Sequence, residues 1–181
     1  MARPAVTDVK KVASIGGGPI GAGWAAHFLA RGYGVAGYVH SMSEEAAYRK
    51  VLDTAWISLT ALGLAPGASR DRLTLTDSLE ACVADAGFVQ ESAPERLELK
   101  QKLYETLGRI VPADVVIASS TSGLMMTDIQ LLCSTPERTV IGHPFNPPYL
   151  LPLVEVVGGA KTSPDAIQAA ARGHHFLSVH K

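Results

Sequence analysis

Residues 12–40, VASIGGGPIGAGWAAHFLARGYGVAGYVH, decide the fold. A short apolar run is followed at once by Gly16-x-Gly18-x-x-Gly21, then by a helical stretch and by a second apolar run at 35–39. This order predicts strand, glycine-rich turn, helix and strand within about 30 residues, the context in which such a glycine spacing indicates a dinucleotide site. The alternative is a glycine-rich turn that binds no ligand.

Each position of the turn has a physical role. Gly16 lets the chain leave the strand in a tight turn, Gly18 lets a pyrophosphate approach the backbone, and Gly21 lets the helix lie close to the strand. Proline suits the first helical turn because its missing N–H would have no partner there. The free N–H groups and the helix dipole then face an anion. We therefore expect the cofactor to lie against Gly16, Gly18, Pro19, Ile20 and Gly21.

The composition narrows the class of protein. With 181 residues, 47% hydrophobic and 18% charged, the chain is globular rather than disordered. A net charge of −1 gives no electrostatic case for nucleic acid or an anionic membrane. No signal-peptide core or membrane-spanning run is present, and Cys82 and Cys133 lack metal-ligand spacing. We expect a cytoplasmic protein with reduced thiols and with no metal site and no nucleic-acid or membrane partner.

Apolar runs alternate with helical patterns along the rest of the chain. Further strands are expected at 73–75, 86–90, 115–118, 139–142 and 153–157, with helices from about 44 to 62, 78 to 83, 95 to 110 and from 163 onward. This alternation predicts an α/β fold with a Rossmann-type doubly wound, mostly parallel sheet. The expected division is a flexible lead-in at 1–9, a nucleotide-binding domain at 10–172, and a truncated or atypical tail at 173–181, where Gly173-His174-His175 interrupts the last helix.

The first helix carries an apolar stripe at three- and four-residue spacing, which predicts one core-facing side. That stripe consists of Ile20, Trp24, Ala25, Phe28 and Leu29. His27 sits beside it and is interpreted as a packing or surface histidine, because no other metal-ligand residue type lies one turn away.

The second strand lacks a residue that dinucleotide sites use. An acid about 20 positions past the glycines ordinarily binds the adenosine ribose hydroxyls. Here the strand ends at Val39, followed by His40 and Ser41, and the nearest acids, Glu44 and Glu45, belong to the next helix. No arginine stands there to receive a 2′-phosphate, so NAD is favoured over NADP. Losing the charge-assisted bonds costs on the order of 1.5–3 kcal/mol of cofactor binding, with His40 or Ser41 as a partial replacement.

Three polar residues are expected together beside a nicotinamide. Ser122 and His143 each follow a strand end, and Glu155 lies on the strand after His143. Ligands of such sheets bind outside the carboxyl ends of the strands. A histidine base, a carboxylate that fixes its tautomer and a serine donor suit oxidation of a secondary alcohol. Taken singly, each residue is more often a turn, loop or solvent-facing residue than a catalytic one.

Longer stretches carry a family resemblance. Residues 15–24, 89–96, 119–123 and 142–159 (IGGGPIGAGW, VQESAPER, SSTSG and GHPFNPPYLLPLVEVVGG) resemble the NAD-binding domain of the 3-hydroxyacyl-CoA dehydrogenase family. Within that family, the pattern is most similar to the branch that oxidises carnitine. The resemblance implies catalytic roles for Ser122, His143 and Glu155, and it places Glu91 and Lys100 in the region lining the cofactor and substrate cleft. The implied reaction is NAD-dependent oxidation of the 3-hydroxyl of L-carnitine to 3-dehydrocarnitine.

The family pattern also includes a C-terminal all-helical domain. By resemblance, that domain supplies an active-site asparagine, closes the substrate pocket and forms the homodimer, and this chain ends where it is expected to begin. We therefore expect weakened NAD binding, impaired turnover and an exposed apolar face in the 181 residues, and a homodimer only with that domain. The alternatives are a relative acting on 3-hydroxybutyryl-CoA or L-gulonate, and a catalytically inactive nucleotide-binding or structural fragment.

Overall fold

A computed structural model of the chain describes the backbone of residues 8–178 and the side chains of residues 8–173. The strands are β1 (Lys11–Ile15), β2 (Gly34–Tyr38), β3 (Leu73–Thr76), β4 (Phe88–Glu91), β5 (Ile117–Ser119), β6 (Thr139–Pro144) and β7 (Val154–Gly158). The α-helices are α1 (Pro19–Ala30), α2 (Glu45–Leu62), α3 (Leu79–Val83), α4 (Leu97–Ile110), α5 (Met126–Ile129) and α6 (Pro164–Ser178). Most of the expected lead-in at 1–9 lies outside the described residues.

The strands form one sheet in the order β3-β2-β1-β4-β5-β6-β7. Every neighbouring pair is parallel except β6 and β7, which are antiparallel. The order reverses between β1 and β4, and such a switch point opens a crevice at the carboxyl ends of the strands. The predicted doubly wound, mostly parallel sheet is confirmed, and its switch point adjoins the glycine-rich turn.

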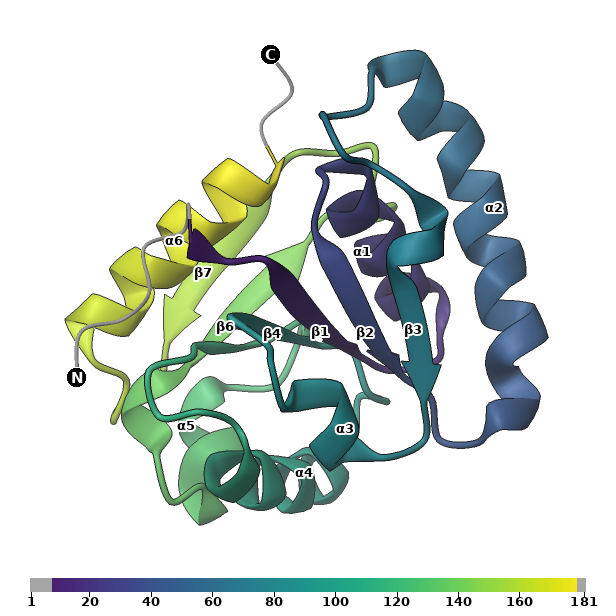
Figure 1. The fold of residues 1–181 in the computed structure, drawn as a ribbon. Helices are drawn as coiled ribbons and strands as arrows, with labels where there is room; N and C mark the ends of the chain where they lie inside the picture. Colours follow the sequence, from purple (N-terminus) through teal and green to yellow (C-terminus); the bar gives the residue numbers. More distant parts are fainter. Residues whose placement is uncertain (1–7, 179–181) are drawn as a thin grey trace.

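Alternation along the strands builds a hydrophobic core on each face of the sheet. Val12 packs with α1, α2 and α6 on one face, whereas Ala13 and Ile15 pack with α3, α4 and α5 on the other. In Figure 1, α6 lies beside β6 and β7 at one end of the sheet, and α2 lies at the end that carries β3. The two cores hold the strand ends, and therefore the site, in fixed register.

The first helix is buried on all sides instead of along one stripe. Every residue from Gly21 to Ala30 is buried, because α1 is enclosed by the sheet, α2 and α6. The His27 ring lies edge-on to Trp24 and Phe28, with centroid distances of 5.9 and 6.0 Å. His27 is thus a packing histidine, and the tightly enclosed α1 gives the glycine turn a rigid base.

Two expectations about the later elements were wrong, and one short helix was not expected. The last helix is not interrupted at 173–175 but continues to Ser178. His143 lies inside β6 rather than after it, since antiparallel pairing with β7 extends β6 to Pro144. The short helix α5 was not predicted from its four residues.

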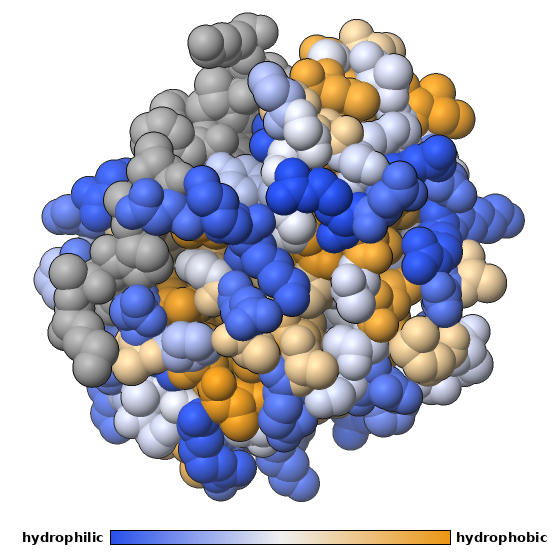
Figure 2. All heavy atoms as spheres, in the orientation of Figure 1, coloured by the Kyte–Doolittle hydropathy of each residue, from blue (hydrophilic) through white to orange (hydrophobic). Residues whose placement is uncertain are grey.

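Hydrophilic side chains cover much of the face drawn in Figure 2. Apolar side chains gather there at the upper right, over the end of α2 and the loop after it, a region that includes the exposed Leu62 and Leu64. Among the described residues, no helix combines the length and apolarity that crossing a bilayer requires.

Candidate active site

The glycine-rich turn forms the wall of a cleft of about 780 Å³. The opposite wall comes from the segment after β4 and from apolar side chains of α4, while the end of β2 closes one side. The lining residues are Ile15, Gly16, Gly17, Gly18, Pro19, Ile20, Tyr38, His40, Glu44, Ser92, Ala93, Pro94, Leu99 and Leu103. The cleft therefore includes Gly16, Gly18, Pro19, Ile20 and His40, five of the eight residues predicted to bind the cofactor.

The turn is shaped for close approach of a ligand. Gly16 has a φ of +128°, a conformation that favours glycine, and a Cβ there would lie 2.5 Å from the carbonyl oxygen of Ser92. A Cβ at Gly21 would overlap the carbonyl oxygen of Gly16. A Cβ at Gly18, by contrast, would meet nothing within 4 Å. Gly16 and Gly21 are thus required for the backbone of the turn to pack without a clash, whereas Gly18 faces open space that a pyrophosphate can fill.

The start of α1 supplies an anion-binding end. Gly18 is the N-cap residue and has no side chain to cap the helix, and no acid stands in the first turn. The N–H groups at this end lack helical partners, and their partial positive charge favours a phosphate. The residues present fit a dinucleotide, with the diphosphate at the turn and apolar contacts from Leu99 and Leu103 in the same cleft.

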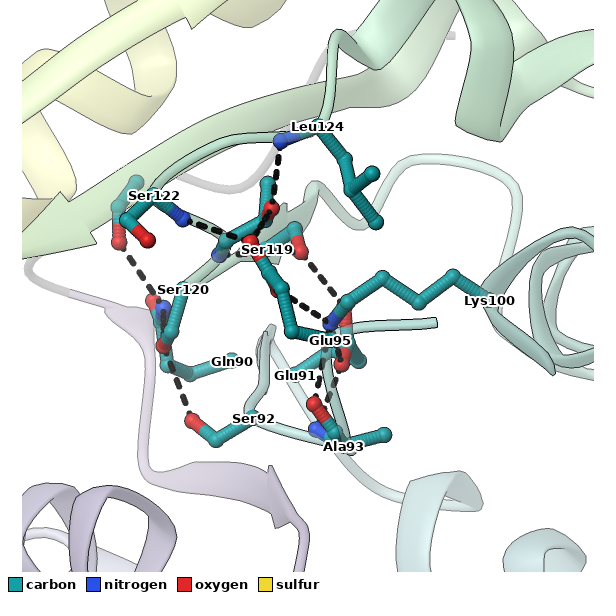
Figure 3. Close-up of polar contacts among 12 residues, drawn as sticks. Gln90, Glu91, Ser92, Ala93, Glu95, Lys100, Ser119, Ser120, Ser122 and Leu124 are labelled. Atoms are coloured by element: carbon teal, nitrogen blue, oxygen red, sulfur yellow. Dashed lines mark hydrogen bonds and ion pairs between the residues drawn. The ribbon is translucent and has the colours of Figure 1, made fainter. Parts of the chain in front are cut away.

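Glu91 and Lys100 lie beneath the cleft wall rather than on its surface. The two side chains are 0% and 1% exposed, and their Nζ–Oε1 distance is 2.5 Å. Glu91 also accepts hydrogen bonds from the N–H of Ala93 and the hydroxyl of Ser119. The pair fixes the turn at 92–95 against β5, as Figure 3 shows. A direct contact of either residue with the cofactor stays a prediction.

Glu95 anchors the loop that carries Ser122 (Figure 3). Its Oε1 accepts from the Thr121 hydroxyl and from the N–H groups of Ser122 and Gly123, both at 3.0 Å. Burial by itself raises the pKa of Glu95, but these bonds and the nearby Lys100 outweigh it and hold that pKa below its ordinary value. The bonds fix the loop backbone and leave Ser122 exposed beyond the end of β5.

A polar network joins the cleft wall to β6. Ser120 Oγ lies 2.8 Å from Ser92 Oγ and accepts from Gln90 Nε2 at 2.8 Å and from Trp24 Nε1 at 3.2 Å. Gln90 Nε2 also donates to the carbonyl of Gly142 at 3.0 Å. Because Gly142 immediately precedes the histidine of β6, this network connects that histidine to the cleft.

His143 and Glu155 form a direct pair. They are register partners across the antiparallel strands β6 and β7, and the distance from Nδ1 to Oε2 is 2.9 Å. The imidazole is 26% exposed and the carboxylate 59% exposed. Ser122 lies beyond the adjacent strand β5, and among the described residues it makes no hydrogen bond to either partner. Two of the three predicted catalytic residues are thus in contact, and the third is on the neighbouring strand end.

The family model described as "3-hydroxyacyl-CoA dehydrogenase, NAD binding domain" matches residues 11–176. The chain belongs to the 3-hydroxyacyl-CoA dehydrogenase family. It contains the NAD-binding domain of that family, and the predicted resemblance is confirmed over most of the chain. NAD is the cofactor of this domain.

Relatives of this family domain include L-carnitine dehydrogenases. That of Streptomyces coelicolor is 57% identical over 91% of this chain and 52% of its own length. That of Streptomyces griseus subsp. griseus is 58% identical over 91% of this chain and 49% of its own length. The chain therefore spans about half the length of the curated relatives it matches.

Two solved structures of dehydrogenases have a similar fold. FHMPC 5-dehydrogenase, described as an NAD⁺-dependent dismutase, has a TM-score of 0.86 at 32% identity, over 94% of this chain and 56% of its own. The 3-hydroxybutyryl-CoA dehydrogenase of Escherichia coli K12 has a TM-score of 0.85 at 29% identity, over 94% of this chain and 37% of its own. Both cover nearly all of this family domain.

Sequence reasoning missed two residues of the site in this family member. Glu44 lines the cleft although it was assigned only to the next helix, and Glu95 positions the serine loop from 27 residues away. The signal for Glu44 was the turn at Ser41-x-Ser43, which follows the strand and brings the next acid back toward the glycines. No local pattern marked Glu95, because its partners come from a distant loop.

Proposed function

We propose that this chain supplies the NAD-binding domain and the acid–base pair of an enzyme that oxidises the 3-hydroxyl of L-carnitine to 3-dehydrocarnitine. The observation that carries the proposal is the 2.9 Å hydrogen bond between His143 Nδ1 and Glu155 Oε2. It stands at the end of β6, joined to the cofactor cleft by the Gln90–Ser120 network. The similarity to L-carnitine dehydrogenases supports the choice of substrate.

The pair is arranged for removal of a hydroxyl proton. With its Nδ1–H donated to Glu155, the His143 ring carries its lone pair on Nε2, the atom that accepts the proton. The negative carboxylate then stabilises the imidazolium that forms. Bound NAD⁺ supplies the acceptor for the hydride that leaves the same carbon. Ser122, held by Glu95, donates a hydrogen bond to the reacting oxygen.

Phe145 supports a quaternary ammonium substrate. Phe145 is 40% exposed, and its ring lies 6.0 Å, centroid to centroid, from the imidazole of His143. An exposed aromatic face attracts a trimethylammonium group by a cation–π interaction. Tyr149, the second aromatic residue of the segment after β6, is instead partly buried against the core and against Gly23 of α1. Phe145 is therefore the residue proposed to contact the cation.

The test compares initial rates of NADH formation by the natural polypeptide with L-carnitine, 3-hydroxybutyryl-CoA and L-gulonate. We expect carnitine to give the highest kcat/KM, and His143→Ala to lower turnover by about 10²–10⁴-fold while leaving NAD affinity nearly unchanged. A higher kcat/KM with either alternative substrate rejects carnitine but keeps the dehydrogenase. Turnover that survives His143→Ala rejects the histidine as the base.

Phe145→Leu isolates the substrate part of the proposal. Loss of the aromatic face is expected to raise the KM for carnitine about 2- to 30-fold, and to change kcat less. Tyr149→Leu is the matched aromatic control and is expected to leave that KM nearly unchanged. Calorimetry with NAD on the 181-residue chain tests the inactive alternative, since absence of binding at millimolar NAD would leave only a structural role.

A further inference from the structure

The end of β2 carries no acid, yet the cleft beside it contains a carboxylate. Val39, where the family pattern has an acid, is 0% exposed and belongs to the hydrophobic core. Glu44 lines the cleft instead, together with Tyr38 and His40 from the same strand end. Among the residues that line the described cleft, Glu44 is the only one with a carboxylate side chain.

A short turn brings Glu44 back toward the glycines. The Ser41 side chain accepts from the N–H of Ser43 at 3.3 Å and caps a 3₁₀ turn at residues 42–44. The N–H of Glu44 donates to the carbonyl of Ser41 at 2.9 Å, which fixes its backbone. The side chain then reaches the glycine-rich turn, where a Cβ at Gly17 would overlap Glu44 Oε2.

Gly17 lies close to both Glu44 and Val39. A Cβ there would lie 3.6 Å from Cγ1 of Val39 as well as against the Glu44 carboxylate. The Glu44 carboxylate is therefore close to the place that a strand-end acid at residue 39 would face. The hydrogen-bond acceptor at this corner of the cleft is therefore the Glu44 carboxylate, which comes from the 3₁₀ turn at 42–44 and not from β2.

The surroundings of Glu44 are negative. Burial raises the pKa of Tyr38, and the charges of Asp77, Glu44 and Glu80 raise it further. No lysine or arginine is among the residues that line the described cleft. A second phosphate at this corner would meet repulsion, whereas ribose hydroxyls can donate to the carboxylate.

We propose that Glu44 binds the adenosine ribose hydroxyls of NAD in place of the absent strand-end acid, and thereby selects NAD over NADP. The inference rests on the NAD-binding role of the domain and adds the residue that reads the ribose. It requires no contact from the substrate or from any other part of the protein.

The test measures dissociation constants for NAD and NADP by calorimetry with the 181-residue chain. We expect Glu44→Gln to weaken NAD binding about tenfold or more, the effect of losing charge-assisted hydrogen bonds. NADP binding is expected to stay equal or improve, so the preference for NAD falls. Glu45→Gln is the matched control, because Glu45 is adjacent in sequence and pairs with Arg49 instead. Thermal unfolding without cofactor checks that both variants are folded.

An analogue of NAD that lacks the adenosine 2′-hydroxyl separates recognition from a structural effect. The native chain is expected to bind it more weakly than NAD, whereas Glu44→Gln binds the two alike, because removing both partners of one contact is not additive. Unchanged or tighter NAD binding by Glu44→Gln overturns the inference alone. Failure of the native chain to bind NAD overturns both the inference and the proposed function.

Discussion

At the scale of single residues, two buried cations have polar partners inside the fold. Arg138 is 1% exposed and donates to the backbone carbonyls of Gly108, Val111, Pro112 and Val115. The buried Lys100 instead meets a carboxylate, that of Glu91. A buried ion pair adds little net stability, but removing one partner leaves the other charge without compensation.

Lys100→Met is therefore expected to lower the free energy of unfolding by about 3–5 kcal/mol. The variant leaves the Glu91 carboxylate buried with its hydrogen bonds from Ser119 and Ala93 but without its cation. Urea unfolding measures the loss, and Lys102→Met, an exposed change on the same helix, is the control. The double change with Glu91→Gln should recover part of the loss. Equal stability of the two single variants would contradict the prediction.

Glu95 makes the serine loop sensitive to acid. Its pKa is lower in the folded chain than its ordinary value near 4.3, so its stabilising contribution is present above that value and is lost as the pH falls through the folded pKa. Glu95→Gln should lower the melting temperature at pH 7, and this effect should shrink as the pH falls through the folded pKa, because the native residue then becomes protonated too. Glu98→Gln, an exposed acid three residues further on in the first turn of α4, is the comparison. A pH-independent difference would assign Glu95 a packing role only.

At the scale of elements, the glycines of the turn have different roles: Gly21 is needed for folding, whereas Gly18 is expected to matter for cofactor binding. Gly18 has φ −79° and ψ 177°, which alanine adopts without strain, and a Cβ there meets nothing within 4 Å. Gly18→Ala should keep or slightly raise stability, by up to about 1 kcal/mol, and weaken NAD binding. Gly21→Ala drives a Cβ into the Gly16 carbonyl and should destabilise by about 1–3 kcal/mol or more. Urea unfolding and NAD calorimetry on both variants check this, and equal unfolding midpoints would contradict it.

Elements with local signals were predicted, and those set by tertiary contacts were not. The spacing of Gly16, Gly18 and Gly21 determined β1, the turn and α1, and the strand ends placed His143 close to Glu155. The extension of β6 through His143 depended on antiparallel pairing with β7, which no local pattern encodes. Likewise, the position of Glu44 in the cleft depended on a three-residue turn that brings the chain back to Gly17.

At the scale of the whole molecule, His143 and Glu155 lie on the two strands at one edge of the sheet, β6 and β7, beside exposed apolar side chains, whereas the cofactor cleft lies at the switch point between β1 and β4. The segment between β6 and β7 exposes large hydrophobic side chains directly after His143, the proposed base, and one more follows on β7. These are Phe145 at 40%, Leu150 at 39%, Leu151 at 45%, Leu153 at 57% and Val157 at 53% exposure. Single exposed hydrophobic residues are ordinary, but several within one segment of 13 residues, 145–157, indicate a surface prone to association.

We therefore expect the 181-residue chain to self-associate as its concentration rises, through the 145–157 segment. Each leucine that is removed from water contributes about 1.5–3 kcal/mol, so one polar substitution measurably shifts the equilibrium. Sedimentation velocity across a range of concentrations should show Leu153→Gln more monomeric than the native chain. Ile57→Gln is the matched control, because Ile57 is 74% exposed on α2 and lies outside this segment. If both variants dissociate alike, or the native chain stays monomeric, the segment is not the association surface.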